Sequence, residues 1–220
     1  QTGLNIDDLR LLPIYLPNAE SQNKIAKFVI DAKNNLEQSK FLYSQAEVLL
    51  LEELGIKDID LSHEPCYEVN SADIIHANRI DAEYYQPKHE RLIEAIKNSK
   101  YGWCKLADKI TNITDKHDPT KEPENDFRYI ELSNINPSIG IIDGYSELKG
   151  KDLPSRARML VKESDVIISS VEGSIEKIAL VDSYHDSCLA STGFFIFRSK
   201  ENTLSEYTLV LSKSILIQKQ

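Results

Sequence analysis

A basic segment in the second half of the chain carries the residue types that bind phosphate. Between positions 149 and 162, five Lys and Arg residues stand against one acid, Asp152, although the 220-residue chain has a net charge of −9. The five are Lys149, Lys151, Arg156, Arg158 and Lys162. Such side chains contact phosphate oxygens, and Arg also reads guanine. A local basic patch on an acidic protein predicts binding to a defined polyanion site rather than general coating.

The basic segment leads into an apolar run that ends in hydroxyl groups. Residues 166–168 are expected to form a buried strand, and two serines and a Glu-Gly-Ser turn follow it. Serine hydroxyls and turn N–H groups can donate to phosphates and bases. The predicted DNA-binding residues are therefore Lys149, Lys151, Arg156, Arg158, Ser169, Ser170, Ser174 and Lys177. An alternative stays open, in which the arginines pair with surface acids and the serines cap turns.

The motifs of common enzyme classes are missing from the sequence. It contains no glycine-rich phosphate loop, no dinucleotide-binding loop and no His-Glu-x-x-His zinc motif. The five histidines have no metal-ligand spacing, and Asn136-Pro137 is interpreted as a turn rather than as part of a methyltransferase tetrapeptide. We therefore expect no catalytic residue, no metal site and no cofactor on this chain.

Cysteine usage and hydropathy indicate the compartment. The three cysteines are odd in number and far apart, which fits neither a disulfide framework nor a zinc knuckle. A reduced, cytoplasmic setting is expected. No run approaches the roughly 20 apolar residues of a membrane span, so no membrane partner is expected.

One long helix is predicted to position these residues. Residues 19–55 contain no interior Gly or Pro, with Asn18 as the expected cap and Gly55 as the expected stop. Apolar positions alternate by four and three along it, the spacing of a coiled-coil seam. The predicted helix-pairing residues are Ile25, Val29, Ala32, Leu36, Tyr43 and Leu50. The seam could pack on the chain's own domain, but we favour an antiparallel pair with a like helix.

The remaining segments predict an α+β fold: a long coiled-coil-forming helix followed by a mixed domain with short, mostly antiparallel strands. Residues 1–18 are interpreted as the tail of a preceding domain, 56–80 as a linker, and 81–220 as a domain truncated near its end. Helices are expected at 82–98, with Asp81 as cap, and at 205–214, with Ser205 as cap. Strands are expected at 103–113, 128–135, 139–142, 158–161, 165–171, 177–181 and 192–198. The charged loop 115–126 is expected to be exposed and mobile.

Three stretches follow one another in a recognisable order. The first is IYLP at 14–17, with Glu20, Gln22 and Ile25; the second is RIDAEYYQP at 79–87. The third is RMLVKESDVIISS at 158–170, followed by KIALV at 177–181, ASTG at 190–193 and FIFR at 195–198. Together they resemble the specificity (S) subunit of type I restriction-modification systems, HsdS, over nearly the whole chain. Two departures are Ser164 and Glu176, positions where that family commonly has Gly.

The resemblance implies a division of labour. Residues 81–220 would be a DNA target-recognition domain, and the long helix would pair antiparallel and space two such readers along double-stranded DNA. The chain would be a non-catalytic specificity subunit, and partner modification and restriction subunits would methylate adenine and cut DNA with ATP. Because one long helix is present, we expect a homodimer through it, with Phe28, Leu42 and Leu49 docking modification subunits. The alternatives are a coiled-coil scaffold that binds protein without DNA, and an enzyme with an unrecognised site.

Overall fold

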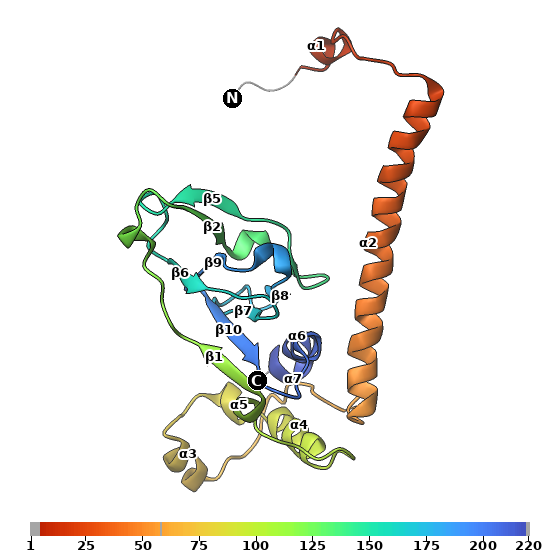
Figure 1. Cartoon of the computed structure of the whole chain (residues 1–220). Coiled ribbons are helices and arrows are strands. Elements are labelled where there is room, and N and C mark those ends of the chain that lie inside the picture. Colours follow the sequence, from red (N-terminus) through yellow and green to blue (C-terminus); the bar gives the residue numbers. More distant parts are fainter. Residues whose placement is uncertain (1–4, 58, 219–220) are drawn as a thin grey trace. The chain divides into compact units, whose positions relative to one another are not determined.

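The long helix is present as predicted in the computed structural model, which describes residues 5–57 and 59–218 (Figure 1). Helix α2 spans Ala19–Glu53. At its start the Ser21 N–H donates to the Asn18 side chain over 2.9 Å, which satisfies one free helix donor. At its end Gly55 adopts a φ of +69°, and the Ile56 N–H donates to the Leu51 carbonyl over 3.0 Å. This is the glycine-terminated ending that the sequence predicts.

The chain divides into two units, residues 1–41 and 42–220. Helix α2 begins in the first unit and ends in the second. In the first unit a short helix, α1 (Ile6–Arg10), is followed by an extended segment at 11–17. Its apolar side chains are exposed, and the segment forms no strand among the described residues. Its assignment to a preceding domain remains a prediction.

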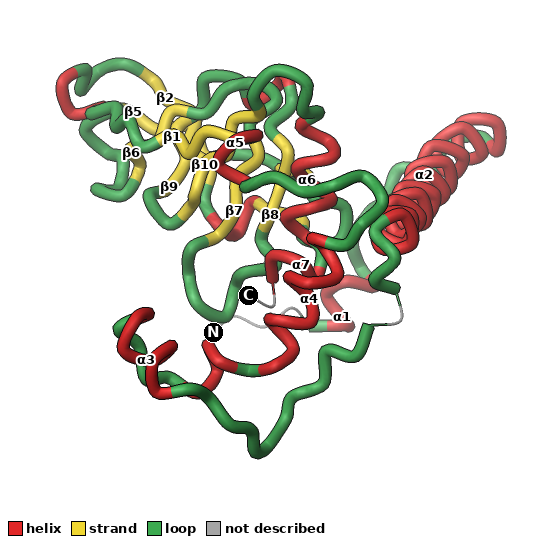
Figure 2. Tube along the Cα trace, turned by 90° about the horizontal axis from the view of Figure 1, so that it is seen from below, coloured by secondary structure: helices red, strands yellow, loops and turns green. Residues whose placement is uncertain are grey.

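Short, mostly antiparallel strands build the second unit, as expected for an α+β domain (Figure 2). One sheet has the order β1-β10-β7-β8 and is antiparallel throughout. The other has the order β5-β2-β9-β6, in which only the pairing of β2 with β9 is parallel. The strands are β1 (Ile110–Ile113), β2 (Asp126–Ile130), β5 (Ser146–Lys149), β6 (Ala157–Leu160), β7 (Val166–Ser169), β8 (Ile178–Leu180), β9 (Leu189–Ser191) and β10 (Phe194–Ser199), with a separate pair of β3 (Ile135–Asn136) and β4 (Ile141–Ile142).

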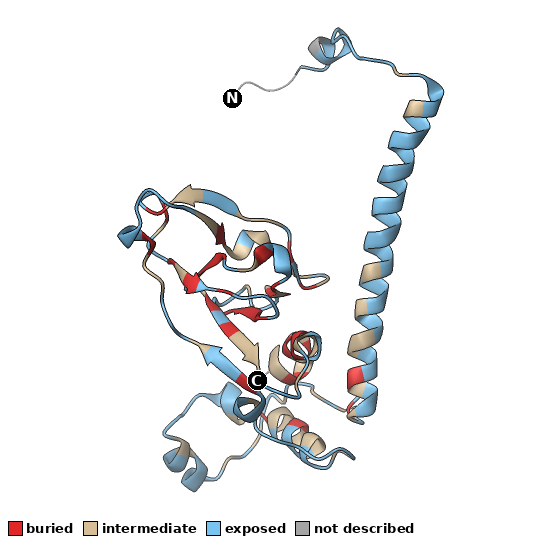
Figure 3. Cartoon of the chain, in the orientation of Figure 1, coloured by how far each residue is buried: buried red, intermediate tan, exposed pale blue. Residues whose placement is uncertain are grey.

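The domain core lies among these strands (Figure 3). Strand β7 is buried along its full length, which explains why its sequence is a continuous apolar run instead of an alternating one. The central cluster comprises Ile130, Ile135, Ile142, Met159, Val161, Ile167, Ala179, Val181, Cys188, Ala190, Phe194 and Ile196. Cys188 is completely buried, and its thiol pKa rises to about 11 because burial disfavours the thiolate.

Several predicted boundaries need correction. The expected strand at 103–113 begins as a helix, α5 (Leu106–Lys109), and the strand at 128–135 is interrupted by the 3-10 helix η3 (Leu132–Asn134). Strands β5 and β9 were not predicted. Helix α6 (Ser205–Lys213) begins where expected, but its cap is Leu204, which offers no side-chain bond. The short helices α7 (Ile215–Gln218), η2 (Pro119–Lys121) and η4 (Ser183–His185) complete this part of the domain.

The predicted linker, residues 56–80, is bonded to the start of α4. It contains helix α3 (Ser71–Ala77), and the 3-10 helix η1 (Ala82–Tyr85) and helix α4 (Pro87–Lys97) follow it. The Gln86 side chain, 2% exposed, accepts from the Glu64 N–H over 3.0 Å and donates to the Glu64 carbonyl over 3.1 Å. This two-sided pairing fixes the segment to the start of α4.

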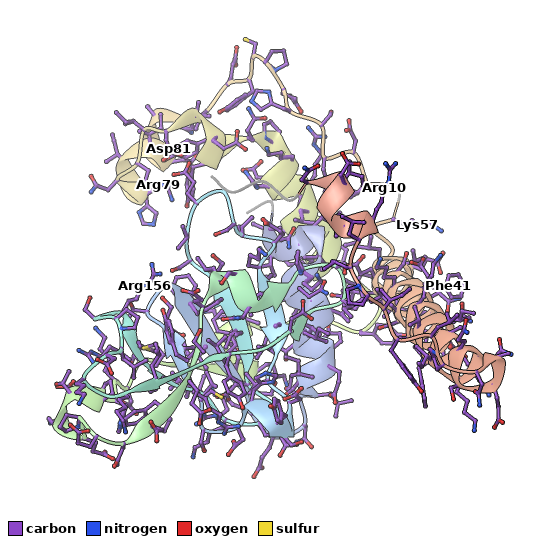
Figure 4. All side chains as sticks on the ribbon, turned by 90° about the horizontal axis from the view of Figure 1, so that it is seen from above. Arg10, Phe41, Lys57, Arg79, Asp81 and Arg156 are labelled. Carbon is purple, nitrogen blue, oxygen red and sulfur yellow. The ribbon has the colours of Figure 1, made fainter. Side chains whose placement is uncertain are left out.

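Asp81 caps the turn that opens the second motif. Its carboxylate accepts from the Tyr84 N–H over 3.1 Å. Asp81 is therefore a cap, but of η1 and not of one helix over 82–98, because α4 begins separately at Pro87 with Gln86 as its cap. Arg79 donates to the Asp81 carboxylate over 2.8 Å, and its guanidinium lies 4.1 Å from the centre of the Tyr84 ring (Figure 4). The motif therefore folds as a local unit. Among the described residues no helix has the length and apolar character needed to cross a bilayer.

Candidate nucleic-acid interface

Lys149 and Lys151 flank Gly150, a turn position that has no room for a side chain. A Cβ at Gly150 would lie 2.3 Å from the Pro119 carbonyl oxygen and 2.4 Å from that of Glu122. Glycine therefore lets the end of β5 approach the loop that contains η2. The Gly150 N–H donates to the Asn125 carbonyl over 2.9 Å and holds that approach. Loop 115–126 is thus anchored by backbone bonds, although we expected it to be mobile.

The lysines beside this turn both reach the residue Glu124. The Lys149 ammonium donates to its carbonyl over 2.9 Å and lies 3.5 Å from the Asp126 carboxylate. Lys151 forms a 3.0 Å ion pair with the Glu124 carboxylate and is half exposed. Each lysine is therefore partly neutralised by an acid of the neighbouring strand or loop.

The two arginines are also paired with acids. Arg156 donates to the Tyr129 hydroxyl over 3.2 Å, and this bond raises the pKa of Arg156. It also lies 3.4 Å from the Glu131 carboxylate, at the margin of the strands (Figure 4). Arg158 lies 3.1 Å from Asp118. Hydrogen bonds from the Thr120 hydroxyl and N–H, and then the charge of Arg158, hold the pKa of Asp118 below its usual range.

The four paired cations differ in exposure, with Arg156 the most exposed and Arg158 the least, at 22%. Arg156 and its partner are 61% and 37% exposed, and exposed pairs contribute only about 0–1 kcal/mol. A phosphate can therefore replace the carboxylate at little cost. The paired acids lower the positive field of the basic segment.

The serines take different positions. Ser169 is 4% exposed, and its hydroxyl accepts from the Val171 N–H over 3.1 Å and lies 3.0 Å from the Ser174 hydroxyl. The Ser174 hydroxyl also bonds the Val171 carbonyl over 3.0 Å. These two serines cap the turn after β7, as the alternative interpretation held. Ser170 is exposed and donates to the Gly193 carbonyl over 3.0 Å.

Lys177 points into the domain rather than toward a ligand. Its ammonium donates to the Ile135 carbonyl over 3.0 Å and is partly buried. Lys177 and Ser169 are thus both held by partners inside the fold, and their assignment to DNA binding stays a prediction. Ser174 lies in the turn after β7, and Ser170 is the serine that faces solvent.

A short turn joins the arginine and serine parts of the site. The Thr192 N–H donates to the Arg156 carbonyl over 2.8 Å, and the Ser170 N–H donates to the Gly193 carbonyl over 2.9 Å. The turn at 192–193 thus lies between Arg156 and Ser170, and Thr192 is exposed. Thr192 and Gly193 belong to the motif at 190–193 but are not among the residues predicted to bind DNA. Among the described residues no group of acids, histidines and cysteines could hold a metal ion.

The helix-pairing residues divide into two sets. Ile25, Val29 and Leu36 are 59%, 65% and 40% exposed, and Ala32 is exposed as well. Leu50 is instead buried with Ile56, Leu92 and Leu216 in the chain's own domain. Tyr43 packs partly buried against the cluster of Val166, Ile168, Ile178 and Leu209. Leu50 is therefore corrected to a core residue, and Tyr43 lies at the same junction.

Half of the chain is similar to HsdS. The HsdS subunit from Thermoanaerobacter tengcongensis matches with 32% identity and a TM-score of 0.47, over 50% of this chain and 28% of that one. A chain from a structure on the assembly and conformational transition of the type I R-M system matches with 31% identity and a TM-score of 0.45, over 51% and 31%. This chain therefore spans less than a third of either. No family model and no curated protein matches.

Proposed function

We propose that this chain is a DNA-reading specificity subunit of a type I restriction-modification complex. The observation that carries the proposal is the order of its motifs: a helix-entry motif before α2, the RIDAEYYQP stretch, and the motif that spans β6 to β10. The exposed basic residues and the turn at 192–193 support it. Each lies on the same strand-rich domain that the motifs define.

The basic residues act in this proposal by exchanging partners. Arg156 and Arg158 leave Glu131 and Asp118 and contact phosphates, which sets the register of the domain on the duplex. The exposed turn at 192–193 and Ser170 then lie beside the bound backbone, where turn N–H groups and hydroxyls can approach bases. Sequence is read there, because phosphate contacts alone carry no base information.

The chemistry of methylation and cleavage belongs to partner subunits. The chain supplies no catalytic residue in this proposal and needs no cofactor of its own. Modification subunits dock on the apolar residues of α2 outside the pairing seam, of which Phe28, Leu42 and Leu49 are 76%, 55% and 57% exposed. A restriction subunit joins the same complex. The complex acts in the cytoplasm, where its DNA substrate lies.

A second copy of the chain completes the reader. Ile25, Val29, Ala32 and Leu36 form an exposed apolar stripe, which two antiparallel helices would cover mutually. Each copy then presents one recognition domain, so the dimer reads a target in two halves with a fixed gap. The residues of the seam after position 42 serve the domain instead.

Reconstitution tests the function directly. The chain is mixed with modification subunits of a type I system, S-adenosylmethionine and random-sequence DNA, and methylated adenines are mapped by sequencing. We expect methylation at one bipartite sequence, and none when the chain is omitted. The control variant carries Lys24→Met, which removes a lysine of α2 that does not belong to the basic segment 149–162. Methylation at the same sites without the chain, or none with it, would reject the proposal in favour of a protein-binding scaffold.

A further inference from the structure

The last turns of α2 form a joint with the recognition domain. Leu50, Leu51 and Leu54 pack with α4 and α7, and Tyr43 packs against the sheet that contains β7 and β8. Helix α6 lies at the same place, because Leu209 belongs to the cluster that Tyr43 contacts. The last turns of α2, from position 42 on, are therefore attached to the domain by these contacts.

Two cations sit at this joint. Lys100, in the loop after α4, forms a 2.8 Å ion pair with Glu53 in the last turn of α2, and Lys213 contacts the helix two to three turns earlier. At the end of α6, the Lys213 ammonium donates to the Pro137 carbonyl, in the connection between β3 and β4. The same ammonium lies 4.9 Å from the centre of the Tyr43 ring on α2. At that distance a partly buried ammonium attracts the face of the ring. A single side chain therefore contacts α2, α6 and the β3–β4 connection.

The charges around Lys213 come from two further positions. Glu47 of α2 and Glu176 of the β7–β8 turn both favour its charged form, although burial lowers the pKa of Lys213 overall. Burial likewise raises the pKa of Glu47, which the lysine opposes. Each group is thus stabilised by the other, because neither is fully solvated. The Tyr43 hydroxyl is buried and has no hydrogen-bond partner among the described residues. Tyr43 therefore contacts the Lys213 ammonium through its ring.

We propose that Lys213 is the positioning residue that fixes the direction of α2 relative to the DNA-reading sheet. It joins the helix, by the Tyr43 ring, to the carbonyl of Pro137 in the β3–β4 connection. This deepens the proposed function, because a helix that spaces two readers can measure a gap only if each joint is stiff. The apolar contacts of the joint are non-directional, and the Lys100–Glu53 pair joins α2 only to the loop after α4, whereas Lys213 contacts α2, α6 and the β3–β4 connection together.

A distance measurement tests the proposal without DNA. Spin labels are attached at Gln45→Cys on α2 and Glu147→Cys on β5, both exposed, after the exposed Cys66 and Cys104 are changed to Ser. The labelled chain is mixed with excess unlabelled chain, so that only distances within one copy are measured. We expect one narrow distance distribution.

The variants separate the cation from its packing. Lys213→Met keeps the apolar stem and should widen the distribution at least about twofold, because the helix then samples several directions. Lys213→Arg keeps the charge and should restore the narrow distribution. Lys162→Met is the matched control, because it removes an exposed lysine elsewhere on the domain. It should leave the width of the distance distribution unchanged.

Thermal unfolding shows whether each variant is folded. If Lys213→Met loses its cooperative transition, Tyr43→Leu replaces it, because this change keeps an apolar side chain at the joint and removes the ring under the ammonium. It should widen the distribution in the same way. Wild-type widths in Lys213→Met, or in the Tyr43→Leu substitute, would overturn the proposal. Failure of DNA binding would leave these distances unchanged, so the two proposals fail separately.

Discussion

Arg198 holds the buried carboxylate of Asp165 by two parallel hydrogen bonds of 2.7 Å, from Nε to Oδ1 and from Nη2 to Oδ2. Asp165 is completely buried, and its carboxylate also accepts from the Lys162 N–H over 2.8 Å. The pair connects β10 to the start of β7, the strand that leads to the serine turn. Asp165 and Arg198 therefore both lie within the motif that runs from position 158 to position 198.

Loss of Arg198 should destabilise the domain strongly. Arg198→Met leaves the Asp165 carboxylate buried without its cation, which should cost about 2–4 kcal/mol, below the full range because the arginine is one-third exposed. Urea denaturation followed by circular dichroism measures the change. Arg156→Met removes an arginine from an exposed pair and should cost less than about 1 kcal/mol. Equal costs in the two variants would contradict this assignment.

Ser164 adopts a left-handed conformation with a φ of +70°. Gly reaches this conformation without the steric cost that a Cβ imposes. Ser164→Gly should therefore stabilise the chain by about 0.5–1 kcal/mol, because the relief of strain exceeds the entropy that Gly loses. Ser170→Gly, in the turn after β7, is the control and should not stabilise. A lower urea midpoint for Ser164→Gly would show that the serine is not strained.

Local signals in the sequence predicted the elements they control. The Asn18 cap and the Gly55 stop act within one turn, so both ends of α2 could be placed correctly. Strand β9 was missed because its partners, β2 and β6, are distant in sequence and its run is three residues long. Burial of Leu50 was missed for a related reason. A seam pattern shows that a face is apolar, but not which surface covers it.

In the candidate site, too, the sequence showed the type of each residue but not what covers its side chain. Residue type predicted which side chains could bind phosphate, and Arg156 and Lys151 are indeed exposed. Side-chain direction could not be predicted for Ser169 and Lys177. Their inward orientation depends on the Ser174 hydroxyl and on a carbonyl 42 positions away in the sequence. Those partners meet only after the sheets have formed.

Substitutions in the arginine pair should move DNA affinity in opposite directions. Arg156→Ala should weaken binding about threefold to tenfold and lower the salt slope by about one, because one phosphate contact is lost. Glu131→Gln should strengthen binding, since it removes the carboxylate that competes for the arginine. Gel shifts on random duplex at several salt concentrations measure both effects.

Lys24→Met provides the control for these measurements, because Lys24 pairs with Glu20 on α2 and lies outside the basic patch. It should leave both affinity and salt slope unchanged. Weaker binding by Glu131→Gln would mean that the acid orients Arg156 for DNA instead of competing with it. No effect of Arg156→Ala would favour the scaffold interpretation.

The two halves of the α2 seam should respond differently to substitution. Val29→Asp places a charge in the proposed helix pair and should weaken dimerisation at least about 100-fold, because the carboxylate would be buried without a partner. Asn34→Asp adds the same charge about 140° around the helix and should have no effect. Leu50→Ala should lower the free energy of unfolding by about 2–4 kcal/mol through a core cavity and leave the dimer intact. Sedimentation velocity measures association and urea denaturation measures stability. A dimer lost in Leu50→Ala but kept in Val29→Asp would mean that the wrong half of the seam has been assigned to pairing.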